Sequence, residues 1–254
     1  DRGPGDLMVP TVLVFAGPDP GGGAGLAADI AAIGALGGHA LPVATALTVQ
    51  DNNRVHEVQP VDCGLVTRQA DALIDTCNID AVKIGIPGSR ENAVAIARLL
   101  RQLRAADPRL PVVLDPVLAS GHGDALGKGN ALAALAELLP LATIVTPNLP
   151  ELHAIGEIPC EHVLVTGGHG AGDIIVNRWL SAGLEQRSWR LPRLPHDYHG
   201  SGCTLAAAIA ARLALGDSMG DALEHAQDYC HQTLAHAFWI APGQRIPRRI
   251  LHTH

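Results

Sequence analysis

The sequence contains few lysines, few aromatic side chains and no long hydrophobic run. Only two lysines, Lys83 and Lys128, occur among its 254 residues, and Phe, Trp and Tyr together make up 3%. The net charge of −7 argues against a nucleic-acid-binding surface. No apolar run approaches the length that spans a membrane, and no signal-peptide pattern opens the sequence. We therefore expect no nucleic-acid or membrane partner. Contacts to an anionic ligand must come mostly from arginine, histidine and backbone amides.

The cysteines do not form a disulfide or metal-binding pattern. They are odd in number and lack C-x-x-C spacing, standing at positions 63, 77, 160, 203 and 230. A reduced, cytoplasmic setting is expected. Because 47% of the residues are hydrophobic, the chain can bury a large core. We predict one domain over 1–254, with a core over about 9–241 and flexible termini.

Short apolar runs alternate with helical patterns along the chain. Strands are predicted at 11–16, 41–49, 80–86, 111–117, 142–146, 162–166 and 173–177. A helix is predicted over 90–105, with Ser89 as its N-cap. The segment 172–195 has no helical period, which indicates edge strands or a hairpin. This alternation predicts an α/β fold whose central sheet is mainly parallel and has helices on both faces.

The most informative segment is His199-Gly-Ser-Gly-Cys-Thr204, because it runs directly into a strong helical pattern. The unpaired amides and the dipole of a helix start bind anions, and they also bias a cysteine toward its thiolate. Gly200, Ser201, Gly202 and Cys203 are therefore candidates for holding a transferring phosphoryl group. The alternative is that Ser201 only caps the helix and Cys203 is only a small buried side chain.

A second glycine cluster, 17–25, lies between a predicted strand and a predicted helix. Strand, glycine loop and helix form a ligand-binding arrangement, because glycine lets the backbone approach a ligand closely. Pro20 breaks the G-x-G-x-x-G pattern of dinucleotide-binding sites, and the acidic residue that such sites have about twenty positions further on comes later than expected, at Asp51 after Gln50. We expect both glycine loops at the same edge of the sheet, facing one cleft.

Six motifs in this order resemble the hydroxymethylpyrimidine and phosphomethylpyrimidine kinases of thiamine biosynthesis, which belong to the ribokinase-like superfamily. The motifs are Ala16-Gly-Pro-Asp-Pro20 with 22–25, Val82-Lys-Ile-Gly85, Val113-Leu-Asp-Pro-Val117, Thr146-Pro-Asn148 with Glu151, Gly167-Gly-His169, and Gly200-Ser-Gly-Cys-Thr204. The resemblance covers about 9–241. It implies a ribokinase-like fold, an ATP-dependent kinase and a homodimer.

The resemblance also implies a magnesium site and a nucleotide site. It places Mg²⁺ near Asp115 and Glu151, which follow neighbouring strands, and hard carboxylate oxygens suit this ion. It places ATP near Asn148, Thr166 and Gly168. The alternatives are a helix-cap role for Asp115 and a solvated first-turn role for Glu151. His169, His196 and His199 are weaker candidates, as phosphate-side or surface contacts.

The aminopyrimidine substrate is expected over the first glycine loop. Its ring edge presents a donor beside an acceptor, which the amide of one Gln can match. The family's pyrimidine-binding Gln corresponds to Gln50, although a Gln at a strand end is often an ordinary polar terminus. The resemblance carries further positions toward this pocket, with Ile86 replacing a common Met: Gly17, Ala24, Asp29, Ile86 and Val117.

Cys203 would lie beside the substrate hydroxymethyl group, either as a general base or as a backbone N–H donor. Relatives commonly have Lys where Thr166 stands and Lys near Gln227, so nucleotide contacts are altered here. Pyridoxal kinase, which generally has Asp at the position of Cys203, and a non-catalytic pyrimidine-binding protein are the alternative functions. Only twelve residues separate Asn148 from Glu161. A parallel crossover needs a dozen or more residues, usually with a helix, so either the crossover is trimmed here or a segment is missing from the sequence. We favour the missing segment.

Overall fold

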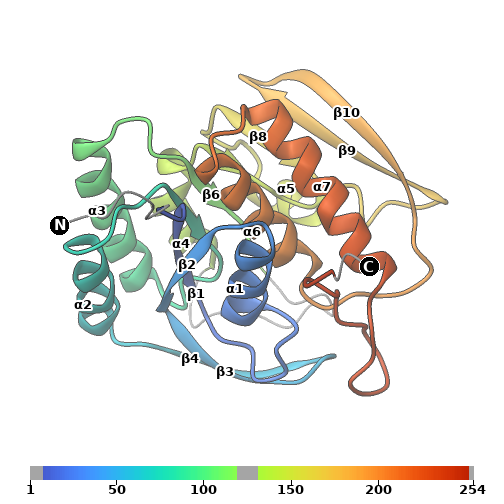
Figure 1. Ribbon diagram of the computed structural model, residues 1–254, viewed down its shortest axis with the longest axis horizontal. Coiled ribbons are helices and arrows are strands. Elements are labelled where there is room, and N and C mark those ends of the chain that lie inside the picture. Colours follow the sequence, from blue (N-terminus) through green and yellow to red (C-terminus); the bar gives the residue numbers. More distant parts are fainter. Residues whose placement is uncertain (1–7, 119–130, 252–254) are drawn as a thin grey trace.

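The computed structural model describes residues 8–118 and 131–251 (Figure 1). Of the termini predicted to be flexible, 1–8 and 242–254, residues 1–7 and 252–254 lie outside this range, and 242–251 are described, with Ile246 and Arg249 buried. In the described chain an eight-stranded sheet has the order β10-β9-β8-β7-β6-β5-β1-β2. The six strands from β2 to β8 in this order are parallel, and β9 and β10 are antiparallel. The strands are β1 (Thr11–Ala16), β2 (His39–Ala44), β5 (Ala81–Ile84), β6 (Val112–Leu114), β7 (Ile144–Val145), β8 (His162–Val165), β9 (Ile174–Ser181) and β10 (Leu184–Pro192).

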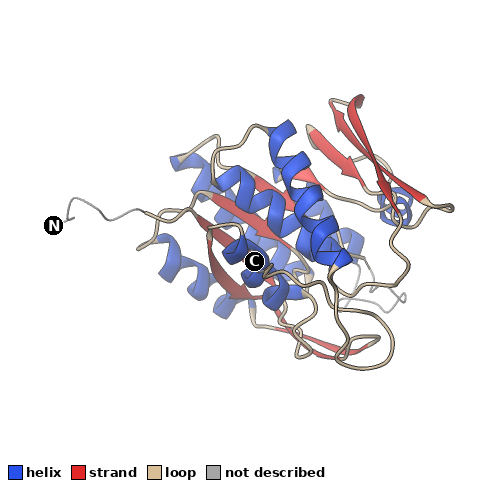
Figure 2. Cartoon of the chain, turned by 45° about the vertical axis from the view of Figure 1, so that its right-hand side comes forward, coloured by secondary structure: helices blue, strands red, loops and turns tan. Residues whose placement is uncertain are grey.

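Helices cover both faces of the sheet, as predicted (Figure 2). The central strands are apolar on both sides because each face packs against helices. One core joins the strands to α1 (Gly25–Ala35), α6 (Ser201–Ala214) and α7 (Met219–Ala235). The other joins them to α2 (Cys63–Ile74), α3 (Arg90–Ala106) and α4 (Ala131–Leu138). The Ser89 hydroxyl accepts from Asn92 N and caps α3, which confirms the predicted start of that helix.

The predicted strand 41–49 is two strands that belong to different sheets. The chain leaves the main sheet after Ala44 and continues as β3 (Ala46–Gln50), which pairs with β4 (Val55–Pro60) in a separate two-stranded sheet. Strand β4 was not predicted, because its Pro, His and Glu residues leave no apolar run. The segment 172–195 forms the β9–β10 hairpin, which confirms the prediction made for it.

The crossover between β7 and β8 is short but complete. A capping box formed by Asn148 and Glu151 starts the seven-residue helix α5 (Leu149–Ile155), and Gly156 follows it with φ 77°. The two strands then pair in parallel. The expectation of a missing segment is therefore wrong, because one short helix is enough to reverse the chain here.

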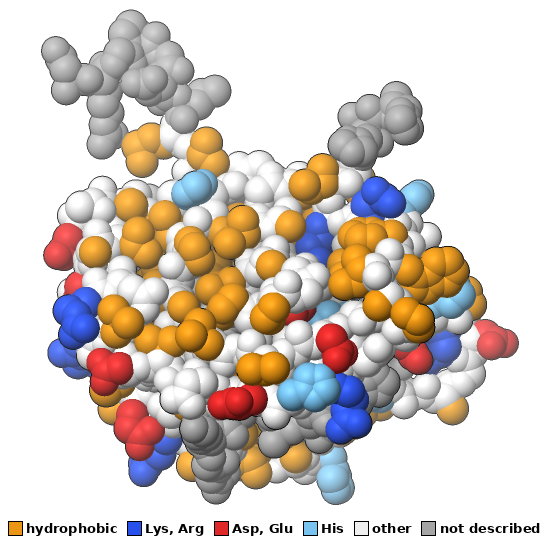
Figure 3. All heavy atoms as spheres, turned by 90° about the horizontal axis from the view of Figure 1, so that it is seen from below, with side chains coloured by type: hydrophobic (Ala, Val, Ile, Leu, Met, Phe, Trp, Pro, Cys, Tyr) orange, Lys and Arg blue, Asp and Glu red, His pale blue; other side chains and the backbone are white. Residues whose placement is uncertain are grey.

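The lower face of the molecule, which carries the β3–β4 sheet, shows many hydrophobic side chains, with the charged ones mostly near its margin (Figure 3). Leu47 and Val49 on β3 are each 56% exposed. None of the helices in 8–118 and 131–251 is both long enough and apolar enough to cross a membrane.

Candidate active site

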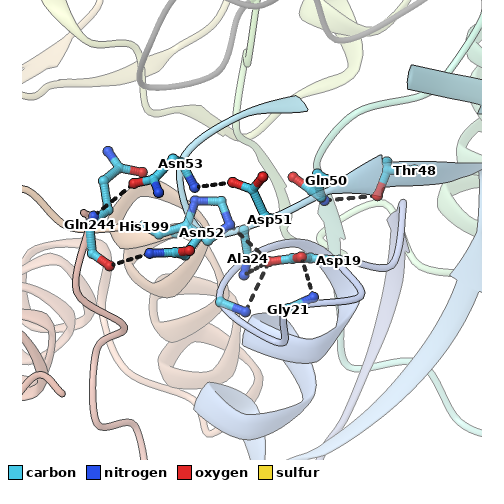
Figure 4. A network of polar contacts seen from close by, with 12 residues as sticks. Asp19, Gly21, Ala24, Thr48, Gln50, Asp51, Asn52, Asn53, His199 and Gln244 are labelled. Atoms are coloured by element: carbon cyan, nitrogen blue, oxygen red, sulfur yellow. Dashed lines mark hydrogen bonds and ion pairs between the residues drawn. The ribbon is translucent and has the colours of Figure 1, made fainter. Parts of the chain in front are cut away.

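The two glycine loops lie side by side at the carboxyl edge of the sheet, as predicted. Asp19 is buried, and its carboxylate accepts hydrogen bonds from the amides of Gly21, Gly23 and Ala24 at 2.7–2.9 Å. The ring nitrogen Nε2 of His199, from the other loop, lies 2.8 Å from Asp19 Oδ2 (Figure 4). Burial raises the pKa of Asp19, but His199 and the loop amides more than offset it and hold the pKa below its usual range. One ionised side chain thus organises both loops.

Gly200 is the residue on which the close approach of the loops depends. It precedes α6 with φ 77°, in the left-handed region that favours glycine. A β-carbon at this position would lie 2.0 Å from the carbonyl oxygen of Gly23. Any side chain here would separate the loops. The amides of Ser201, Gly202 and Cys203 follow at the start of a 14-residue helix, where they have no partners within the helix.

Buried charges lie beneath this helix start. Lys83 and Asp29 have no exposed side-chain surface, and Nζ lies 2.9 Å from Oδ2. Burial opposes the charge of Lys83, but Asp29 raises its pKa above the usual range, so this lysine is a cation. The carboxylate of Asp29 therefore faces Lys83 in the interior. A contact between Asp29 and substrate, as predicted, would fall to its other oxygen, Oδ1, which is buried and has no hydrogen-bond partner among the described residues.

The pKa of Cys203 differs from the sequence-based expectation. Burial raises it to about 11, although the charge of Lys83 lowers it in part. Burial, with the charges of Asp115 and Asp29, outweighs the charge of Lys83 and opposes the bias toward the thiolate that is predicted for a helix start. Cys203 is therefore a thiol at neutral pH.

Asp115 and Glu151 lie within electrostatic reach of each other. Asp115 follows β6 and is buried, and its Oδ2 has no hydrogen-bond partner among the described residues. Burial raises the pKa of Asp115 to about 6 and that of Glu151 to about 7, and the charge of Asp115 contributes to the second shift. A β-carbon on Gly202 would lie 3.7 Å from Asp115 Oδ2, so this oxygen borders the start of α6. Glu151 Oε2 also accepts from Asn148 N in the capping box, so Glu151 lies in the first turn of α5, but its side chain is buried and not solvated as the alternative proposed.

The unpartnered oxygen makes these carboxylates a fit for a divalent cation. Mg²⁺ in proteins is held by one or two carboxylates, with waters and substrate phosphates completing its shell. Within 8–118 and 131–251 no cluster of three or more His, Cys, Asp or Glu could hold a metal without such help. The pair therefore suits an ion that arrives with a phosphate ligand.

Apart from Asp29 on α1, the predicted pyrimidine-binding residues come from four segments, which end or follow β1, β3, β5 and β6. Gln50, at the end of β3, donates from Nε2 to Thr48 Oγ1 at 2.8 Å (Figure 4). A β-carbon on Gly17 would lie 3.1 Å from Cδ1 of Ile86, so these two positions are in contact. Ala24 lies in the loop held by Asp19. Val117 follows Asp115 and donates its N–H to the Asp115 carbonyl.

The predicted nucleotide-binding residues lie after β7 and β8. Asn148 and Thr166 form an isolated parallel bridge, and Gly168 follows. The buried Gln227, near the position where the family resemblance implies a lysine, accepts from Asn177, whose Oδ1 accepts from Gly167 N at 2.9 Å. A neutral chain of amides thus supports this glycine loop. Of the three histidines named as weaker candidates, His199 has its ring nitrogen Nε2 hydrogen-bonded to the Asp19 carboxylate.

Two arginines that were not predicted from the sequence hold glycine loops of the site: Arg193 holds the loop after β8, and Arg249 joins the two loops described above. Arg193 donates to the carbonyls of Gly168, Gly170 and Gly172, each at 2.7 Å. Arg249, near the end of the chain, is buried and donates to Gly23, Gly200 and Thr204. Neither lies in a recognisable motif. The scarcity of lysine was the one signal that pointed to arginine.

A cavity of about 530 Å³ lies next to this site, lined by residues 193–197 and 243–245 with Asn53 and Trp239. Of the predicted site residues, it is lined by His196, one of the weaker candidates. It adjoins the site through His199, whose N–H donates to the carbonyl of Arg245. Asn53, in the β3–β4 turn, bonds the backbone of Gln244 and closes one side (Figure 4).

The fold and the paired loops define a kinase of the ribokinase-like class. Among solved structures, Bacillus subtilis pyridoxal kinase in an ADP complex is similar with a TM-score of 0.80 at 24% identity, covering 95% of this chain and 98% of that one. Clostridium difficile phosphomethylpyrimidine kinase has a TM-score of 0.72 at 29% identity, covering 88% and 98%.

Sequence comparison identifies the family within this class. The model of the phosphomethylpyrimidine kinase family matches residues 19–247, and the chain belongs to this family. The hydroxymethylpyrimidine/phosphomethylpyrimidine kinase of Streptomyces coelicolor is 36% identical over 254 residues, covering 92% of each chain. The family resemblance inferred from the six motifs is thereby confirmed.

Proposed function

We propose that this protein is an ATP-dependent kinase of thiamine biosynthesis. Its substrates would be 4-amino-5-hydroxymethyl-2-methylpyrimidine and the monophosphate of this compound. Family membership supports the reaction class. The observation that carries the proposal is the junction of the two glycine loops, because it sets the start of α6 beside the loop expected to bind the pyrimidine.

The start of α6 would receive the transferring phosphoryl group. Phosphoryl transfer depends mainly on positioning and on neutralising charge, and free amides at a helix start do both. Asp115 and Glu151 would hold Mg²⁺, which when bound neutralises charge on the phosphates. Asn148, Thr166 and Gly168 would contact the nucleotide, with Arg193 fixing the glycine loop that contains Gly168.

Gln50 would select the pyrimidine. Its Nε2 bonds Thr48, which fixes the orientation of the amide at the end of β3. An amide presents a donor and an acceptor together, which matches the aminopyrimidine edge. Cys203, as a thiol, would contribute its backbone N–H to the phosphoryl site.

The test is ADP release by the purified protein with ATP and Mg²⁺, measured with hydroxymethylpyrimidine, its monophosphate and pyridoxal in parallel. We expect turnover with the first two and a kcat/KM for pyridoxal at least tenfold lower. Preference for pyridoxal would assign the other vitamin kinase activity. Binding of the pyrimidine without ADP release would assign the non-catalytic alternative, which the neutral Thr166 and Gln227 would explain.

The homodimer implied by the family resemblance stays a proposal. It is supported by the exposure of Leu47 and Val49 on β3, which would be covered if this face lies between two subunits. Light scattering of the purified protein would measure the mass directly.

A further inference from the structure

Arg249 is an arginine buried at the meeting point of the two glycine loops, with only 5% of its surface exposed. The segment that carries it is fixed against α7, because the hydroxyl of Tyr229 donates to the Arg249 carbonyl at 2.8 Å. The amide of the preceding residue, Arg248, donates to Thr233 O. The guanidinium therefore enters the site from a backbone that is itself held in place.

The guanidinium contacts both loops at once. Its Nη2 donates to the carbonyl of Gly23 at 2.5 Å and lies 3.4 Å from the carbonyl of Gly200. Its Nε donates to Thr204 Oγ1 at 2.9 Å, and this hydroxyl donates in turn to Gly200 O. With the Gly200 carbonyl held toward Arg249 and the helix, the N–H of the same peptide group, which belongs to Ser201, points out of the helix start.

The charge of Arg249 also matters in this place. Six acidic or basic residues are buried in the described chain, and all of them belong to this site: Asp19, Asp29, Lys83, Asp115, Glu151 and Arg249. Four are carboxylates and two are cations. Lys83 forms an ion pair with Asp29. Arg249 therefore adds, together with Lys83, to the positive potential at the start of α6, where a phosphoryl group would bind.

We infer that Arg249 is a positioning residue for phosphoryl transfer. It joins Gly23 to Gly200, so that the loop expected to bind pyrimidine and the phosphoryl-binding amides keep one relative placement. The inference rests on the proposed kinase function for its kinetic consequence. The bridge between the loops can be tested without turnover.

Three variants separate this role from general stability. Arg249→Met removes the donors and the charge but keeps an apolar stem. Arg249→Lys keeps the charge but cannot present the same set of planar donors. Arg248→Met is the matched control, because Arg248 is exposed and its guanidinium lies over Phe238. For folded Arg249→Met we expect kcat to fall at least thirtyfold, with KM for the pyrimidine within threefold of wild type. Arg249→Lys should lose at least fivefold in kcat, and Arg248→Met less than twofold.

Hydrogen exchange of the unliganded protein gives an independent measurement. In Arg249→Met, peptides covering 17–25 and 199–204 should both exchange at least tenfold faster, while the control matches wild type. Faster exchange in only one loop, or in neither, would overturn the bridge. A folded Arg249→Met that keeps kcat within threefold would overturn the positioning role.

Two further outcomes are also decisive. If Arg249→Met does not fold, Arg249→Lys decides, and wild-type kcat and exchange in that variant would overturn the inference. If the wild type releases no ADP with any of the three substrates, the proposed function fails. The exchange measurement then still decides whether Arg249 joins the loops.

Discussion

His199 Nε2 and Asp19 Oδ2 lie 2.8 Å apart and connect two loops that are 180 residues apart in the sequence. The same carboxylate accepts from three amides of its own loop. The first glycine loop is therefore shaped by a residue that also anchors the second. Substituting Asp19 should disturb both loops.

Asp19→Asn should lower the free energy of unfolding by about 1–3 kcal/mol at neutral pH, because a charged acceptor is replaced by a neutral one with a single oxygen. The folded-state pKa of Asp19 lies below the ordinary aspartate value of 3.8. The stability contributed by the ionised form is thus present above that value and is lost as the pH falls through the folded-state pKa. Urea unfolding from pH 3 to 7 should show that the difference in the free energy of unfolding between Asp19→Asn and the wild type becomes smaller as the pH falls.

Asp107→Asn is the matched control for this experiment. Asp107 is exposed and bonds only the amide of Arg109 through its side chain, so its replacement should change stability little. An Asp19→Asn protein as stable as this control would contradict the anchoring role.

Gln50→Leu should weaken pyrimidine binding about tenfold or more, because the donor–acceptor edge of the ligand would lose its match at a cost of roughly 1–3 kcal/mol. ATP affinity should change little. Calorimetry with each ligand measures both. Gln186→Leu on β10, where the amide bonds only the nearby Leu184 carbonyl, serves as the control. Equal losses for ATP and pyrimidine would argue against the assignment.

Lys83→Met should destabilise the fold by about 3–5 kcal/mol, because it leaves the Asp29 carboxylate buried without its cation. Adding Asp29→Leu should recover most of this loss, since the pair is then replaced by apolar groups. Urea unfolding of the wild type, the single variant and the double variant tests this. A double variant no more stable than Lys83→Met would show that the ion pair is not the cause.

The sequence was sufficient to predict the parts of the fold that depend on local pattern. The apolar runs gave the parallel strands, and Ser89 gave the start of α3. The division of 41–49 into β2 and β3 was not predicted, because both halves are rich in strand-forming residues. The break between them depends on what each half packs against. The α5 crossover was misjudged because a seven-residue helix shows little periodicity.

In the site, motif order located the loops but not their environment. The pKa of Cys203 depends on how deeply α6 is buried, which no local pattern reports. Arg249 reaches the site only because the chain returns past α7 to the start of α6. Burial and long-range contacts are properties of the tertiary structure, so these two features required coordinates.

Glu151→Gln should stabilise the metal-free protein relative to wild type as the pH rises. Burial raises the folded-state pKa of Glu151 to about 7, so the native state binds its proton more tightly than the unfolded state. Wild-type stability is then lost between about pH 4.5 and pH 7, by an amount on the order of 1–3 kcal/mol. Gln keeps an oxygen to accept from Asn148 N and does not titrate. Thermal unfolding in EDTA at pH 5 and pH 8 measures this.

If Glu151 is a ligand of Mg²⁺, the ion should stabilise the wild type more than Glu151→Gln and so remove the stability advantage of the variant. Adding Mg²⁺ with ADP at pH 8 should raise the melting temperature of the wild type more than that of Glu151→Gln. Glu137→Gln on α4, where the carboxylate pairs with Arg90 at the surface, is the control and should respond as the wild type does. An equal Mg²⁺ response in all three proteins would remove Glu151 from the metal site.

Cys203→Ala should keep kcat within about tenfold of wild type. Burial holds the pKa of the thiol at about 11, so few molecules carry a thiolate at neutral pH, and Ala retains the backbone N–H at the helix start. If the side chain were the general base, removing it would lower kcat by about 10²–10⁴ with little change in KM. Steady-state kinetics of Cys203→Ala distinguish these outcomes, with Cys63→Ala, at an exposed position of α2, as the control. A loss of a hundredfold or more, confined to Cys203→Ala, would show that bound substrates lower the pKa of this thiol and make it the base.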